Sequence, residues 1–103
     1  MSNGQNRDSD GIMLEKLGNA VTDMEVKFRD CTLQERVDLR PLLEEMLGDF
    51  TQYRLKLLKE GIITTEEQIA EMEAIKKEID SAADKQALMA AIAKTIAFVA
   101  TKI

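Results

Sequence analysis

The sequence contains no histidine and no tryptophan, and only one proline, one tyrosine and three phenylalanines. The absence of histidine removes the side chain that most often serves as a general base, as the partner of a nucleophile or as a ligand of a transition metal. The five glycines are isolated from one another, so the chain has no glycine-rich loop of the kind that holds phosphate groups. These absences argue against an enzyme, and we expect no catalytic residues, no cofactor and no bound metal.

Cysteine occurs once, at Cys31, so no disulfide can form within the chain. A thiol enzyme usually pairs its cysteine with a histidine, which this chain lacks. We interpret Cys31 as a small buried group at the end of an apolar seam; a reactive thiol and an intermolecular disulfide are the alternatives. The acidic pairs Glu44-Glu45 and Glu66-Glu67 lack the spacing of a calcium-binding loop, so we interpret them as parts of solvated helix faces.

Basic residues are too few and too dispersed for a nucleic-acid-binding surface. The chain carries 14 Lys and Arg against 19 Asp and Glu, which gives a net charge of −5. Duplex binding requires a cluster of basic residues that displaces counterions, so we expect no nucleic-acid partner. Residues 1–11 are polar and hold no apolar run typical of a secretory signal. We expect them to form a disordered tail, and we expect the protein to be cytoplasmic.

The rest of the composition favours helices. Ala, Leu, Ile, Met, Glu and Lys are plentiful, apolar residues recur at spacings of three and four, and no stretch alternates apolar with polar residues. A chain of 103 residues can bury one core without metal or disulfide cross-links. We therefore predict an all-α fold, in which residues 12–103 form a single small antiparallel helical bundle.

Capping patterns predict where the helices begin and end. Thr32 with Glu35 forms a capping box, residues 64–68 offer a second one, and Lys59-Glu60-Gly61-Ile62 indicates a helix end. Pro41 either separates a short helix from the next or disturbs a single longer one. The prediction is four helices, over about residues 12–30, 33–60, 65–80 and 82–102. The alternative is three longer helices, with residues 65–103 unbroken, that assemble as a dimer.

Two glycines and two aromatic residues carry expectations about packing. Gly18 and Gly48 fall inside predicted helices, where glycine costs about 1 kcal/mol relative to alanine, so we expect a neighbour to approach closely at both. Phe50 and Tyr53 belong to the apolar seam of the second helix, and we expect both to lie in the core.

Residues 55–80, LKLLKEGIITTEEQIAEMEAIKKEID, combine a leucine-rich helix, a Gly-Ile-Ile-Thr turn, two acids and a lysine-rich helix. This stretch resembles the helical hairpin of the short C-terminal domain family, with matches in type at Gly61, Ile63, Thr64, Glu66 and Glu67. The chain departs from that pattern by the extra Thr65 and by lacking an aromatic residue after the acids. The resemblance covers about a quarter of the chain and implies oligomerisation without catalysis. Ordinary helix-stop and helix-start chemistry explains the same residues, so we do not assign the chain to that family.

Residues 87–103 form the most apolar stretch, with thirteen apolar residues among seventeen. The stretch is too short to span a bilayer comfortably and Lys94 lies near its middle, so we do not expect a membrane-spanning helix. On a helix it presents two apolar stripes. The large residues are Leu88, Ile92, Ile96, Val99 and Ile103, and the small ones are Ala90, Ala93, Ala97 and Ala100.

We expect the large stripe to fill the core and the small stripe to admit a second helix at close range. The predicted interface consists of Ala90, Ala93, Ala97, Phe98 and Ala100. This pattern favours a small non-enzymatic interaction or adaptor protein, which forms a homodimer or binds another helical protein. The alternative is a peripheral membrane or lipid-binding protein that uses the apolar C-terminal helix.

Overall fold

The computed structural model describes residues 2–61 and 64–103, with side chains from Ser9 onward. The described residues form four α-helices: α1 (Ser2–Asp30), α2 (Leu33–Lys59), α3 (Glu66–Ser81) and α4 (Lys85–Ala100). This part of the chain contains no strand, so the predicted all-α class is confirmed. The four-helix form of the prediction also holds, because a break separates α3 from α4.

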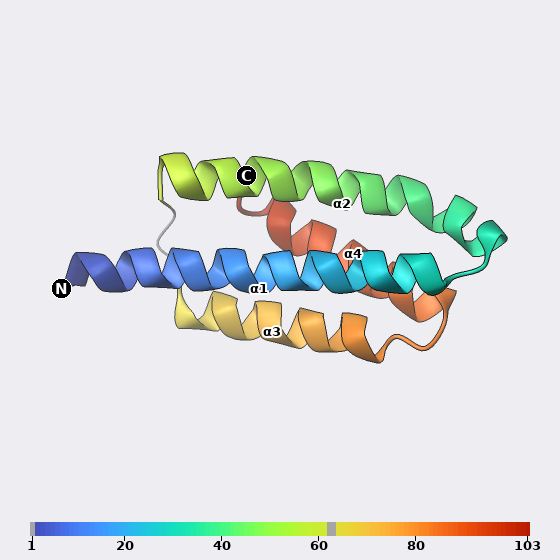
Figure 1. Cartoon of the computed structure of the whole chain (residues 1–103). Helices are drawn as coiled ribbons and strands as arrows, with labels where there is room; N and C mark the ends of the chain where they lie inside the picture. Colours follow the sequence, from blue (N-terminus) through green and yellow to red (C-terminus); the bar gives the residue numbers. More distant parts are fainter. Residues whose placement is uncertain (1, 62–63) are drawn as a thin grey trace.

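The helices run alternately up and down an elongated bundle of 50 × 22 × 19 Å (Figure 1). α1 packs mainly against α3, and α2 packs mainly against α4, while the pairs α1–α2 and α3–α4 close the ring. The consecutive helices α2 and α3 therefore occupy diagonal corners, and α1 and α3 are neighbours that run in the same direction (Figure 1). Each helix buries one face against two neighbours and leaves the opposite face to solvent.

The core follows a seven-residue spacing on every helix. Pairs of fully buried residues seven positions apart recur along the chain: Leu17 and Met24, Leu39 and Met46, Met46 and Tyr53, Met72 and Ile79, and Ile92 and Val99. A seven-residue repeat keeps one stripe facing the partner helices when helices cross at a shallow angle, as in coiled coils and four-helix bundles. The bundle is thus held by regular apolar layers along its long axis.

α1 begins earlier than the sequence predicted, at Ser2 rather than at Ile12. Asp10, which falls in the predicted tail, lies inside α1, and its carboxylate Oδ1 accepts hydrogen bonds from the backbone N–H and the hydroxyl of Thr64, at 2.8 and 2.7 Å. The predicted helix start is wrong because the polar residues before Ile12 show no apolar periodicity. That the tail of residues 1–11 is disordered in solution stays a prediction.

Side-chain caps set the other boundaries. Both predicted capping boxes are present, Thr32 with Glu35 at the start of α2 and Thr65 with Gln68 at the start of α3. Asp84 caps α4 by accepting from the backbone N–H of Ala87 at 2.8 Å, which explains the break near residue 82. Gly61 takes the left-handed conformation, with φ of 72°, as predicted for the end of α2. Ile62 and Ile63, which complete the predicted helix end and the family resemblance, lie outside the described residues.

Pro41 lies inside α2, which continues without a break through it. Proline lacks the N–H that would donate to the carbonyl of Val37, and its ring crowds that turn of the helix. Because Pro41 is exposed, Pro41→Ala should raise the free energy of unfolding by about 1–3 kcal/mol. Urea denaturation followed by circular dichroism measures this change. A loss of stability instead would mean that α2 needs the proline's fixed backbone angle to pack its first turns.

Candidate functional site

The four alanines of the predicted interface form one exposed face of α4. Ala90, Ala93, Ala97 and Ala100, named the alanine face from here on, are all exposed in the isolated chain. The opposite side of α4 is buried against α2 and α3 through Leu88, Ala91, Ile92, Thr95, Phe98 and Val99. Within α4 the division follows the two predicted stripes, with Leu88, Ile92 and Val99 buried and Ile96 half-buried. Ile103, the last member of the predicted large stripe, lies beyond α4 and is 42% exposed, so this part of the prediction is wrong.

Phe98 lies mostly in the core. Its side chain is only 5% exposed, and the Lys102 ammonium lies 4.5 Å from the centre of its ring. On a helix, residue 98 lies near Thr95 and Ala91 rather than near Ala97 and Ala93. Its small exposed part lines a groove between α3 and α4, so its place in the interface stays a prediction.

A groove between α3 and α4 borders the alanine face. Its volume is about 540 Å³, and its lining includes Ala97 together with Ala74 and Ile75 of α3. An ion pair of 2.6 Å between Lys94 and Glu78 ties the two helices together beside it. The groove has an apolar floor and charged edges of both signs, which suits the packing of another helix better than the binding of a charged small molecule.

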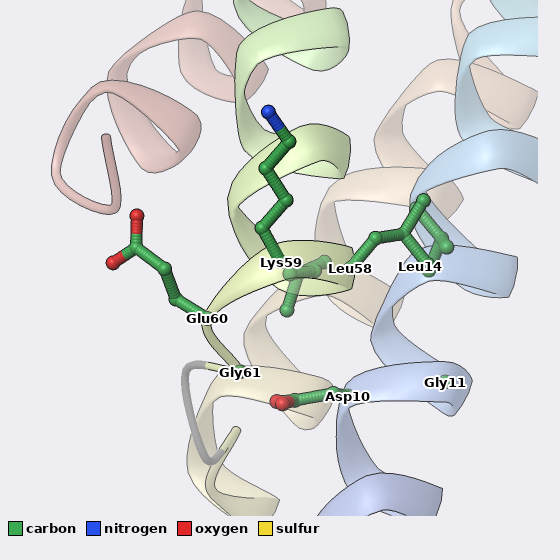
Figure 2. Close-up of a pocket in the computed structure, with 8 residues that line it drawn as sticks. Asp10, Gly11, Leu14, Leu58, Lys59, Glu60 and Gly61 are labelled. Carbon is green, nitrogen blue, oxygen red and sulfur yellow. The ribbon is translucent and has the colours of Figure 1, made fainter.

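A second pocket, of about 430 Å³, lies where the end of α2 meets α1 (Figure 2). Leu14 and Leu58 supply apolar walls, whereas Lys59 and Glu60 point away from α1. Asp10 points from α1 toward Gly61, across the mouth of this pocket (Figure 2). The Asp10 carboxylate that points across the pocket is also the one that bonds to Thr64, so it already has a structural role.

The Asp10–Thr64 contact joins a buried polar cluster that includes Tyr53. Tyr53 is 1% exposed and Thr64 is 4% exposed, so both polar groups depend on partners within the protein. Burial raises the pKa of the Tyr53 hydroxyl; the hydrogen bond with Thr64 acts in the opposite direction, and the Asp10 carboxylate raises the pKa further. The cluster keeps a neutral tyrosine in the core and connects α1, α2 and the approach to α3.

We expect Asp10→Ala to lower the free energy of unfolding by about 1–3 kcal/mol, because it leaves two donors of the partly buried Thr64 without their acceptor. Chemical denaturation measures the loss. Glu15→Ala, at an exposed position of the same helix, is the control and should change stability by less than about 0.5 kcal/mol. Equal effects of the two substitutions would show that Asp10 does not fasten α1 to the loop.

Cys31 lies half-buried beside a pocket of about 320 Å³ at the other end of the bundle. Its thiol donates to the carbonyl of Lys27 at 3.3 Å, and burial, followed by the nearby Glu35 carboxylate, raises its pKa. A raised pKa leaves less of the reactive thiolate at neutral pH. The Lys27 ammonium donates to the carbonyls of Asp80 and Ala82, both at 2.8 Å, and so binds the end of α3. The hydrogen bond of the Cys31 thiol and its raised pKa agree with the interpretation of Cys31 as a structural group rather than a reactive thiol.

Among the described residues, no group of three or more His, Cys, Asp or Glu side chains is placed to hold a metal ion. In the same residues, no helix combines the length and the apolar character that a membrane crossing requires.

Sequence reasoning missed the outward face of α2. Of the seven large hydrophobic residues exposed in the described part of the chain, four lie on this helix: Leu33, Val37, Leu55 and Leu58. The inward seam of α2 is apolar throughout, whereas the outward apolar residues are interrupted by Glu44, Gly48 and Thr51, so the sequence pattern predicted only the inward seam. A Cβ atom built on Gly18 or Gly48 meets no described atom within 4 Å outside its own stretch of helix, so the prediction of a close neighbour is wrong within the chain for both.

No family model, no curated protein and no solved structure matches this chain. The likeness of residues 55–80 to the short C-terminal domain hairpin therefore remains a local resemblance. Any function has to be argued from the surfaces of the bundle themselves.

Proposed function

We propose that this chain is a non-enzymatic helical interaction protein that self-associates through the alanine face of α4. The proposal rests on one observation: Ala90, Ala93, Ala97 and Ala100 are exposed, although α4 is the most apolar helix and its large residues already fill the core. Small side chains allow two helix axes to approach more closely than large ones do. An exposed row of them on an apolar helix is suited to contact with a second helix.

The spacing of the alanines favours a second copy as that helix. The intervals along the face are three, four and three residues, which read the same in both directions. In an antiparallel pair whose two-fold axis lies at the level of Thr95 along the helix, Ala93 faces the partner's Ala97 and Ala90 faces the partner's Ala100. Every layer of the contact then joins small residues to small residues, as an interface that uses the same patch twice requires.

The flanks of the alanine face add area to this contact. Met89 and Ile96, both half-buried, lie between the alanines and α2, and each retains apolar surface that a partner can cover. On the side of α3, Lys94 is held by Glu78 and borders the groove. Burial of apolar area stabilises association by about 25 cal/mol for each Å², so the flanks are needed beside the alanines themselves.

Another helical protein and a lipid surface are the competing partners. The alanine face carries no large apolar side chain to insert between lipids, and Lys94 stands beside it, which favours a protein helix over a bilayer. Light scattering of the full chain at high micromolar concentration tests the proposal. A mass of at least twice that of one chain is expected, whereas a monomer at these concentrations would refute self-association.

A further inference from the structure

The outward side of α2 presents a second apolar seam that no helix of the bundle covers. Its members lie at alternating intervals of four and three residues: Val37, Pro41, Glu44, Gly48, Thr51, Leu55 and Leu58. All of them are exposed, and Glu44 is the only charged residue among them. Val37 is 58% exposed and Leu58 is 64% exposed, which is unusual for large apolar side chains at regular helical spacing.

We propose that this outer seam of α2 is a second self-association surface, in which a second copy packs its own α2 antiparallel across Gly48. This surface goes beyond the proposed contact through α4, because it lies on a different helix and uses different residues. Either contact can be disproved without affecting the other.

Gly48 marks the centre of the proposed contact. It sits in the middle of a helix, where glycine is unfavourable, and outside its own stretch of α2 no described atom lies within 4 Å of the position that a Cβ would take. Packing within the bundle therefore gives no reason for a glycine here. At the crossing point of two helices, the absence of a side chain lets the backbones approach most closely.

The seam is symmetric about this glycine. With a two-fold axis at Gly48, Leu55 lies level with the partner's Pro41, and Leu58 lies one level from the partner's Val37. The large apolar residues therefore meet at both ends of the contact, while Glu44, Gly48 and Thr51 occupy its middle. A surface that is complementary to itself in this way fits a second copy of the chain.

Charges along the edges of the seam are complementary in the same arrangement. Glu44, itself a member of the seam, lies near the level of the partner's Arg54. Asp38 lies between the levels of the partner's Lys56 and the partner's Lys59, and within its own chain it pairs with Lys85 at 2.8 Å, so the Glu44–Arg54 pair carries this point. Neither Glu44 nor Arg54 takes part in an ion pair within the described part of the chain. Arg40, which would otherwise approach the partner's Arg54, is placed over the ring of Phe28 at 5.5 Å. Opposite charges on matching edges favour this register over others.

Disulfide trapping tests the crossing point. Gly48→Cys, introduced with Cys31→Ser to remove the native thiol and Ala97→Arg to block the α4 contact, places one thiol on the two-fold axis. Mild oxidation should then link two chains at least ten times faster than it links the control with Gly18→Cys in the same background. Gly18 is a fair control because it is also a helical glycine with open space around it. Equal rates for the two variants would overturn the proposal.

A charge exchange tests the register without adding a thiol. Glu44→Arg should weaken α2-mediated association about tenfold in sedimentation experiments on the Ala97→Arg background, and adding Arg54→Glu should restore it. Residues 44 and 54 are too far apart along α2 to contact each other within one chain, so a rescue requires a second chain. Failure of the double variant to recover association, with helicity unchanged, would contradict the proposed arrangement. Neither experiment depends on whether the alanine face forms a contact.

Discussion

Tyr53→Ala should lower the free energy of unfolding by about 3–5 kcal/mol, the usual cost of removing a buried aromatic ring. Tyr53 is the bulkiest of the fully buried side chains and belongs to the seven-residue series of α2. Its loss leaves a cavity between the helices and also removes the hydroxyl that bonds to Thr64. Because a domain of this size is stable by only about 5–15 kcal/mol, such a loss is a large share of its total stability.

Two companion variants separate the causes. Tyr53→Phe keeps the ring and should cost only about 0.5–1.5 kcal/mol, the usual contribution of one hydrogen bond. Phe50→Ala removes a ring that is only partly buried, so its cost should lie well below that of Tyr53→Ala. Urea denaturation of the three variants measures these differences. If Phe50→Ala proved as costly as Tyr53→Ala, the inward side of α2 would have to be rotated toward Phe50.

Ala97→Arg should halve the mass of the self-associated protein while leaving its helical circular dichroism spectrum unchanged. Ala97 is exposed, so an arginine there fits the single chain without displacing any core residue. In the proposed two-fold contact, Ala97 faces the partner's Ala93, and a long cationic side chain would separate the helices at two equivalent places. Placing a bulky charged side chain in a contact between small residues commonly costs more free energy than the net free energy that holds a modest interface together.

The matched control is Ala70→Arg, which makes the same substitution at an exposed alanine of α3. Light scattering across a concentration series should give the wild-type mass for this variant and the lower mass for Ala97→Arg. If both variants keep the wild-type mass, the alanine face makes no contact and the proposed function loses its support. If Ala97→Arg unfolds the chain, the face is needed inside the bundle.

Local sequence patterns were enough to predict the fold class and most helix boundaries. Capping boxes and the helix-terminal glycine act over three or four residues, so Thr32, Thr65 and Gly61 could be interpreted without knowing their distant neighbours. The division of α4 into a buried large stripe and an exposed alanine face was predicted for the same reason, since helical periodicity fixes which residues share a face.

The features that depend on pairing between helices could be seen only in the assembled bundle. The early start of α1 is linked to the contact of Asp10 with Thr64, which lies 54 positions away along the chain. Residue spacing placed Phe50 and Tyr53 on one seam, but the packing of α2 between α1 and α4 left the first half-buried and buried the second. The sequence likewise predicted close packing at Gly48, but the arrangement of the four helices leaves this residue on the side of α2 that faces solvent. Local patterns specify a helix and its faces, whereas the partner of each face is set by how four helices share one core.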